Sequence, residues 1–184
     1  MFTMPTQNKA IFLDRDGVIN KEVNYLSDPE EFELLEGTVE ALKIMKHQGY
    51  LLIVITNQSG LARGYFSEET LNDIHTKMKR LLNDGGVELD DIFYCPHHPE
   101  FTGECSCRKP KPGMLLEAKE KYEIDLSRSY MVGDTLSDIK AGKNAGCKTV
   151  FVLTGHGSER EEKIDTVGPD YIYPNLLEFA KSIE

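Results

Sequence analysis

Short apolar runs separated by amphipathic segments constrain this chain more than any other feature of its sequence. Six such runs are too short for helices, so we predict that they are buried strands. The predicted strands are 9–14, 51–55, 91–95, 129–133, 149–153 and 171–173. Continuous rather than alternating hydrophobicity is typical of strands that are covered on both faces, as in a parallel sheet.

Helical periodicity fills most of the intervals between these runs. Residues 38–47 carry apolar side chains at helical spacing and are followed by Gly49, a typical stop signal. Ser67 and Thr70 lie at the spacing of a helix cap, and the apolar face that follows ends before Gly85. Further helices are expected from Pro112 onward, over 137–144 and after Asn175.

Alternating strands and helices predict an α/β fold with a doubly wound, mainly parallel, Rossmann-like sheet. A chain of 184 residues is long enough to bury a core as one domain, 1–184. We expect no large cap domain. The intervals between the motifs described below have room only for a flap-like segment, single elements and a loop insertion at about 95–107.

Polar residues follow three of the predicted strands directly or within two residues. They are Asp14, Thr56 and Asp134. In open α/β sheets, ligands bind beyond the carboxyl ends of the strands. We therefore expect these three side chains to converge on one crevice.

Asp14 and Asp16 are two positions apart where the first strand ends, and Gly17 permits the chain to turn there. Such a pair can act on a phosphate ester, with Asp14 attacking phosphorus and Asp16 protonating the leaving oxygen. The alternative is a pair of solvated turn aspartates, which an isolated pair would favour. The buried strand before the pair and the motifs that follow favour chemistry.

Residues 56–60 offer a hydroxyl and the backbone amides of a glycine-containing turn, which can hold phosphoryl oxygens. A plain turn explains this segment equally well. Arg108 and Lys109 place two cations before a helix, where a lysine can neutralise charge in a transition state. The flanking Pro110 and Pro112 predict a rigid loop rather than a solvated tail, which favours a functional interpretation.

Asp134 follows the fourth predicted strand, and Asp138 lies one helical turn later. Mg²⁺ prefers oxygen ligands, commonly one or two carboxylates together with phosphate and water. Asp14 and Asp134 can supply these carboxylates. Asp138 can either orient the ligands of the metal or simply cap the helix, and the capping interpretation is at least as strong.

Taken in order, these segments resemble the four motifs of haloacid dehalogenase-type phosphatases over nearly the whole chain. The resemblance implies an aspartyl-phosphate mechanism with Asp14 as nucleophile and Asp16 as acid and base. It implies that Thr56 and Lys109 bind phosphate. It also implies that Mg²⁺ is held by Asp14, Asp134 and the backbone carbonyl of Asp16.

Three cysteines, Cys95, Cys105 and Cys107, lie in one short segment beside His97 and His98. Three thiolates and one imidazole make a closed tetrahedral set, which is typical of structural Zn²⁺. Spacing alone does not choose between the two histidines, and unmetallated loop cysteines are the alternative. Metal would order an insertion that has no apolar run with which to build a core.

This loop on this scaffold resembles the D-glycero-D-manno-heptose 1,7-bisphosphate 7-phosphatases, which serve nucleotide-activated heptose biosynthesis. More distantly it resembles the histidinol-phosphate phosphatases, which are the alternative activity. The heptose resemblance selects His97 as the zinc ligand. It implies substrate contacts for Glu22, Val23, Asn24, Tyr25, Thr56, Asn57, Gln58, Ser59, Arg108 and Lys109. Thr135 departs from the family, which often has a lysine there, so binding of the remote phosphate or anomeric preference is expected to differ.

The net charge of −10 disfavours nucleic acid and acidic membranes as partners, and with them a zinc-dependent nucleic-acid binder. No apolar run approaches the roughly 20 residues that span a bilayer, and the N-terminus has no signal pattern. We therefore expect a cytoplasmic protein with a small phosphosugar substrate, and a monomer because no heptad or apolar stripe is present. A phosphoacceptor module is the non-enzymatic alternative, but it needs neither Asp16 nor a zinc loop.

Overall fold

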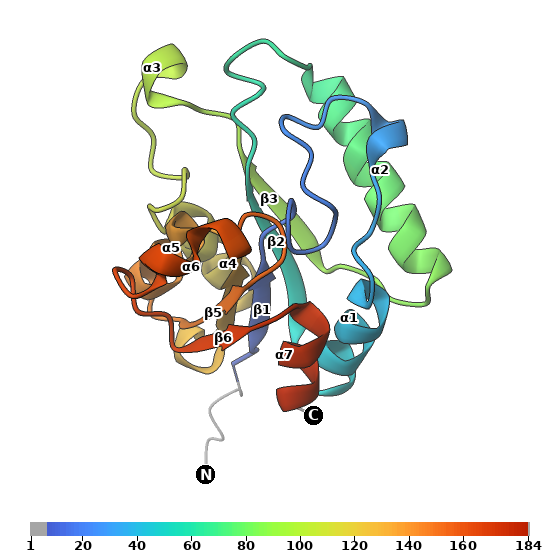
Figure 1. The fold of residues 1–184 in the computed structure, drawn as a ribbon, viewed down its shortest axis with the longest axis vertical. Helices are drawn as coiled ribbons and strands as arrows, with labels where there is room; N and C mark the ends of the chain where they lie inside the picture. Colours follow the sequence, from blue (N-terminus) through green and yellow to red (C-terminus); the bar gives the residue numbers. More distant parts are fainter. Residues whose placement is uncertain (1–6, 184) are drawn as a thin grey trace.

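A parallel sheet forms the centre of the computed structural model, which describes residues 7–183 (Figure 1). Its six strands run in the order β3-β2-β1-β4-β5-β6, and every neighbouring pair is parallel. The strands are β1 Ala10–Leu13, β2 Leu51–Asn57, β3 Asp91–Cys95, β4 Tyr130–Gly133, β5 Lys148–Val152 and β6 Tyr171–Tyr173. The predicted strands and their parallel arrangement are confirmed, with shifts at the ends of a few strands.

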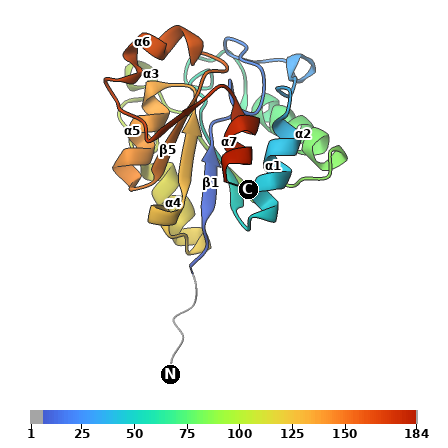
Figure 2. The same cartoon turned by 60° about the horizontal axis from the view of Figure 1, so that its bottom comes forward.

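Helices cover both faces of this sheet (Figure 2). They are α1 Thr38–His47, α2 Glu68–Asp84, α3 Pro99–Thr102, α4 Gly113–Tyr122, α5 Leu136–Ala145, α6 Glu161–Ile164 and α7 Leu176–Ser182. Three 3₁₀ turns are η1 Pro29–Glu31, η2 Leu126–Arg128 and η3 Ser158–Arg160. The five longer helices were predicted. The short α3 and α6 were not, because one helical turn has no period to detect.

Strand β1 shows how the two faces of the sheet are buried. Ile11 and Leu13 point into a core formed with α1, α2 and α7. Ala10 and Phe12 point into a second core under α4 and α5. Because successive side chains in a strand alternate between faces, a strand buried on both sides must be apolar throughout.

Predicted helix caps are present at two helices. The Ser67 hydroxyl accepts a hydrogen bond from the Thr70 backbone N–H at 3.2 Å, at the start of α2. The Asn175 side chain accepts one from the backbone N–H of Glu178 at 2.9 Å, at the start of α7. Each cap satisfies a backbone donor that the first turn of a helix leaves unpaired.

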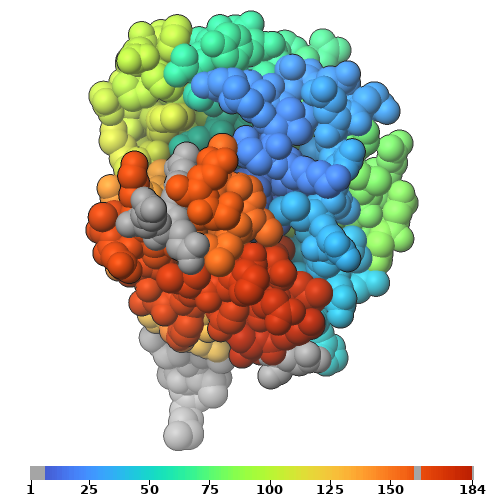
Figure 3. Space-filling model, in the orientation of Figure 1, coloured from blue at the N-terminus to red at the C-terminus, as the bar shows by residue number. Residues whose placement is uncertain are grey.

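All six strands point their carboxyl ends to the same edge of the sheet, where the connecting segments gather. In Figure 3 the segment after β1 (blue), the loop after β3 (yellow-green) and the segment after β5 (orange) border one hollow face. Between residues 7 and 183 no helix combines the length and the hydropathy that crossing a membrane requires. The site described next lies in this hollow.

Candidate functional site

A cavity of about 270 Å³ opens at the carboxyl edge of the sheet. It brings together the side chains that the motifs predicted, from segments far apart in the sequence. Its lining includes Asp14, Asp16, Glu22, Val23, Asn24, Tyr25, Thr56, Asn57, Gln58, Ser59, Arg108, Lys109, Asp134 and Thr135. The cysteine cluster lies outside this cavity, and Asp138 lies behind it, fully buried.

Lys109 is the cation at the base of the cavity. Its Nζ lies 2.9 Å from Asp14 Oδ1 and 2.6 Å from Asp138 Oδ1, and it donates to the backbone carbonyl of Ile55 at 2.8 Å. Burial alone would lower the pKa of Lys109, but Asp138 and Asp14 outweigh it and raise this pKa above its ordinary value. Lys109 is therefore charged and held at a fixed point beside Asp14.

The position of Lys109 is set by strand β2. The Asn57 side chain accepts a hydrogen bond from the Lys109 backbone N–H at 3.0 Å and donates one to the Lys109 carbonyl at 3.1 Å. Asn57, which was predicted to bind substrate, thus lines the cavity, and its amide group forms two hydrogen bonds with the backbone of Lys109. Such a two-point contact fixes a loop more firmly than a single hydrogen bond.

Asp14, Asp134 and Asp138 each bring a carboxylate oxygen within 4.8 Å of the other two. Burial, and then repulsion from Asp138, raise the pKa of Asp14 well above its ordinary value, against the attraction of Lys109. The same two causes raise the pKa of Asp134 to about 7. One lysine does not neutralise three buried carboxylates, so the arrangement calls for a further positive charge.

The two carboxylate oxygens of Asp134 indicate where a further positive charge would bind. Its Oδ2 accepts a hydrogen bond from the backbone N–H of His156 at 2.7 Å. Its Oδ1 is buried and accepts no hydrogen bond from residues 7–183, the side chains of 160–162 left aside. An unpaired buried carboxylate oxygen beside a second carboxylate is the donor set of a hard divalent cation. The residues present therefore fit Mg²⁺.

The segment after β5 is a part of the site that the sequence patterns did not predict. Thr154 Oγ1 donates to the carbonyl of Gly17 at 2.7 Å, which joins this segment to the loop after β1. A Cβ at Gly155 would lie 2.3 Å from Asp134 Oδ2 and 2.5 Å from the Cα of Gly17, so only glycine fits there. The rule that polar residues at strand ends form the site would have identified this segment, since it follows β5 directly.

Asp16 is held by a guanidinium group. Arg15 NH2 donates to Asp16 Oδ1 at 2.8 Å and to Oδ2 at 2.7 Å. The side chains of Asn20 and Gln58 donate to the same carboxylate at 3.0 and 3.1 Å. Burial opposes ionisation, but Arg15 and these hydrogen bonds together keep the pKa of Asp16 below its ordinary value. In this state Asp16 is an ionised acceptor.

Arg15 in turn contacts His75 on α2, with 3.3 Å between NH1 and His75 Nε2. Burial, and then the nearby Arg15, lower the pKa of His75 to about 3, so the imidazole is neutral and its Nε2 accepts. Arg15 itself is fully buried. Neither Arg15 nor His75 carried a sequence signal, because their role depends on contacts between distant segments.

Asp138 caps helix α5, which is one of the two roles that the sequence left open for it. Its Oδ2 accepts hydrogen bonds from the backbone N–H and the hydroxyl of Thr135 at 3.0 and 2.6 Å, which caps α5. Its other oxygen pairs with Lys109. The capping interpretation is confirmed, and Asp138 also positions the cation of the site.

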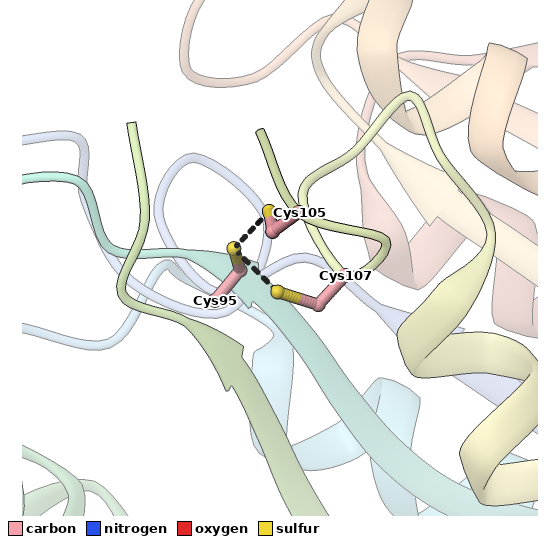
Figure 4. A group of neighbouring side chains, drawn as sticks. All are labelled: Cys95, Cys105 and Cys107. Atoms are coloured by element: carbon pink, nitrogen blue, oxygen red, sulfur yellow. Dashed lines mark hydrogen bonds between the residues drawn. The ribbon is translucent and has the colours of Figure 1, made fainter. Parts of the chain in front are cut away.

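Three cysteine sulfurs meet at the end of β3 (Figure 4). Cys95 Sγ lies 2.9 Å from Cys107 Sγ and 3.6 Å from Cys105 Sγ. The imidazole of His97 is not part of this cluster, and the His97 carbonyl accepts a hydrogen bond from Arg108 NH1 at 3.2 Å. Three thiols close together fit a thiophilic ion such as Zn²⁺.

A parallel sheet with an acidic, lysine-containing site at its carboxyl edge defines a hydrolase of the haloacid dehalogenase class. Residues 106–179 match the family model described as HAD-hydrolase-like. Relatives that match most of the chain identify one family within this class.

The D-glycero-beta-D-manno-heptose-1,7-bisphosphate 7-phosphatase of Pasteurella multocida is 46% identical over 96% of this chain and 97% of its own length. An alpha-anomer enzyme of Photorhabdus laumondii is 48% identical over 80% of this chain and 84% of its own. Among solved structures, the D,D-heptose 1,7-bisphosphate phosphatase of B. bronchiseptica, complexed with magnesium and phosphate, has a TM-score of 0.86. It is 38% identical and covers 95% of this chain and 97% of that one. The chain belongs to the heptose-1,7-bisphosphate 7-phosphatase family.

Proposed function

We infer that this chain is a Mg²⁺-dependent phosphatase that removes the 7-phosphate of D-glycero-D-manno-heptose 1,7-bisphosphate. The observation that carries this inference is the meeting of Asp14, Lys109 and Asp134 in a chain whose full-length relatives are named for that reaction. Mg²⁺ would be held by Asp14, Asp134 and the carbonyl of Asp16. When bound, it supplies positive charge to the transferring phosphoryl group.

We assign the nucleophile to Asp14. A carboxylate oxygen of Asp14 forms a bond to phosphorus while the bond from phosphorus to O7 of the sugar breaks, which leaves an aspartyl phosphate. Lys109 Nζ, 2.9 Å from Asp14 Oδ1, is placed to bind a phosphoryl oxygen as charge moves toward it. Thr56, buried on β2, offers its hydroxyl to the same group.

We assign the proton transfers to Asp16. It donates a proton to the departing O7, and then removes one from the water that attacks phosphorus and releases inorganic phosphate from Asp14. Arg15 keeps Asp16 ionised in the structure described, which suits the second step. An approaching phosphate adds negative charge, which raises the pKa of a nearby carboxyl and prepares Asp16 to carry a proton in the first step.

Phosphate release from the heptose bisphosphate and from histidinol phosphate, each with and without Mg²⁺, tests the proposed activity. We expect Mg²⁺-dependent release with a kcat/KM for the bisphosphate at least about a hundredfold above that for histidinol phosphate. Release from the bisphosphate no faster than background would reject the proposed substrate. Equal release with and without Mg²⁺ would reject the proposed metal requirement.

We further propose that Cys95, Cys105 and Cys107 bind a structural Zn²⁺ with His97 as the fourth ligand. The other candidate, His98, is already in contact with Arg63, since its Nε2 lies 3.1 Å from Arg63 NH2. Arg108 follows Cys107 directly and donates to the His97 carbonyl, so the cluster and the substrate-facing cation share one loop.

Cys105→Ser is expected to eliminate bound zinc and to raise KM for the bisphosphate about tenfold, with a smaller change in kcat, because the loop that carries Arg108 loses its anchor. Metal content by atomic emission and steady-state kinetics measure the two effects. Cys147→Ala is the matched control, since Cys147 is buried in the core under α4 and α5, outside the cluster. Wild-type protein that carries no zinc after purification in zinc-containing buffer would contradict the proposal.

The remaining expectations concern partners. We propose that the chain acts as a cytoplasmic monomer on a small phosphosugar. The cavity of about 270 Å³ supports a small substrate, and the net charge of −10 disfavours a polyanionic partner. Molecular mass in solution, measured by light scattering, tests the monomer.

A further inference from the structure

Arg63 lies in one of three neighbouring segments around the cavity and contacts the other two. The first is the flap, residues 22–26 after β1, which lines the cavity. The second is the turn after β2, which carries Arg63 itself. The third is the cysteine loop, residues 96–107, which contains α3. In Figure 1 the turn after β2 runs across the top of the molecule toward α2, with α3 to its left and the flap to its right.

The contacts of Arg63 are of two kinds. Its guanidinium carbon lies 4.8 Å from the ring centre of Phe101 and 5.7 Å from that of Tyr25, both within the range of cation–π attraction. Its NH2 lies 3.1 Å from His98 Nε2. Because a guanidinium only donates, His98 Nε2 must be the acceptor in this contact. Arg63 therefore joins the flap to the cysteine loop.

Tyr25 is the point in the flap that needs such support. Its backbone has φ +53°, a left-handed conformation that is costly for a residue other than glycine. Tyr25 is 37% exposed as a residue, so burial in the core does not fix its ring. The Tyr65 ring packs edge-on against it at 4.8 Å between ring centres, and Arg63 lies over its face. The conformation of the flap thus depends on these surface contacts.

We propose that Arg63 is a positioning residue that couples the cysteine loop to the flap by holding Tyr25 in its left-handed conformation. Arg63 does not line the cavity and does not take part in the chemistry. It acts on the parts of the substrate that the flap contacts, beyond the phosphoryl group that is transferred. The kinetic effects that this proposal predicts rest on the proposed function, because they presuppose the heptose bisphosphate as substrate.

Amide hydrogen exchange of the substrate-free protein tests the coupling without reference to any substrate. Arg63→Met, which removes the charge and keeps much of the volume, is expected to speed exchange within residues 22–26 about five- to thirtyfold and to leave β1 and β2 unchanged. His98→Ala, a substitution in the cysteine loop, is expected to speed exchange within residues 22–26 by a similar factor. Arg80→Met is the matched control, since exposed Arg80 lies on α2 and is expected to leave exchange in the flap unchanged. Flap exchange unaltered by Arg63→Met or by His98→Ala would overturn the proposal.

Kinetics separate positioning from catalysis. For the heptose bisphosphate, Arg63→Met is expected to raise KM about five- to thirtyfold with kcat within about twofold of wild type. For p-nitrophenyl phosphate, which lacks the groups that the flap contacts, both constants are expected to stay near wild type. A parallel fall of kcat on both substrates would overturn the positioning role. Failure of the wild type on the bisphosphate would reject the substrate assignment alone, since the exchange experiment still decides the coupling.

A double-mutant cycle tests whether Arg63 acts on the flap through Tyr25. Tyr25→Gly accepts the positive φ without strain but removes the ring that Arg63 holds. We expect Arg63→Met to change flap exchange less than about twofold when it is added to Tyr25→Gly. Arg63→Lys is expected to recover part of the wild-type protection, because it keeps a cation over the rings and loses the planar fork that reaches His98. Fully additive effects of the two substitutions would contradict the assigned target.

Discussion

Asp14→Asn is expected to reduce phosphate release by about 10⁴-fold or more, because an amide of the same shape cannot form the bond to phosphorus. The wild-type chain is expected to become labelled by substrate carrying a radioactive 7-phosphate, in an acid-stable and hydroxylamine-sensitive form. The Asp14→Asn chain should remain unlabelled. Phosphate release by the variant within about tenfold of wild type would exclude Asp14 as nucleophile.

The Tm of the Asp14→Asn variant is the control for this experiment. In the metal-free protein, Asp14 is one of three neighbouring buried carboxylates that face a single lysine. Removing one carboxylate relieves repulsion, while Lys109 keeps Asp138 and the Ile55 carbonyl as partners. We therefore expect a Tm at least equal to that of wild type without Mg²⁺. A large fall in Tm would attribute the lost activity to folding.

Asp16→Asn is expected to lower kcat for the heptose bisphosphate by about 10²–10⁴-fold, the usual range for loss of general acid–base catalysis. A substrate whose leaving group needs no proton separates the first step of the reaction from the second. Nitrophenolate leaves without a proton, so the variant should release one equivalent of it rapidly from p-nitrophenyl phosphate and then stall at the aspartyl phosphate. Stopped-flow absorbance measures this burst.

Turnover of the bisphosphate at the wild-type rate by the Asp16→Asn variant would contradict the acid and base role. The structure also provides a matched variant. Asn20→Ala removes one hydrogen bond to the same carboxylate, at 3.0 Å, and leaves the acid in place. Its effect on kcat is expected to be about tenfold or less, since the stronger contact with Arg15 remains.

Much of the fold follows from local patterns in the sequence. In β1, residues Ala10 to Leu13 are all fully buried, which accounts for a continuous apolar run rather than an alternating one. The longer helices were predicted because their apolar faces repeat and because residues such as Ser67 and Asn175 cap them. The four-residue α3 and α6 could not be predicted, because their existence depends on how the surrounding loops pack.

The site was predictable where a polar residue ends an apolar strand. Asp14, Thr56 and Asp134 meet at the cavity because parallel strands bring their carboxyl ends to one edge. The residues that support them were not predictable in this way. Arg15 is fully buried and His75 lies on a distant helix, and only the packing of α2 on the sheet brings the two together.

The roles of individual side chains also depended on contacts that a sequence does not show. Asn57 was predicted to bind substrate, and its amide instead holds the backbone of Lys109 at two points. Its contact with substrate stays a prediction. His97 was predicted to complete the cysteine cluster, and its role as a ligand also stays a prediction, since its imidazole lies apart from the three sulfurs.

The anchoring of Asp134 has a consequence for the choice of metal ion. The backbone N–H of His156 occupies one oxygen of this carboxylate, and the close approach of Gly17 and Gly155 leaves that oxygen no room to turn. We therefore expect Asp134 to bind a cation through one oxygen, Oδ1. Ca²⁺ commonly takes both oxygens of a carboxylate and a larger number of ligands, whereas Mg²⁺ takes fewer ligands in a stricter geometry. We therefore expect the site to favour Mg²⁺ over Ca²⁺, because one backbone amide and two glycines limit how many atoms of Asp134 face a cation.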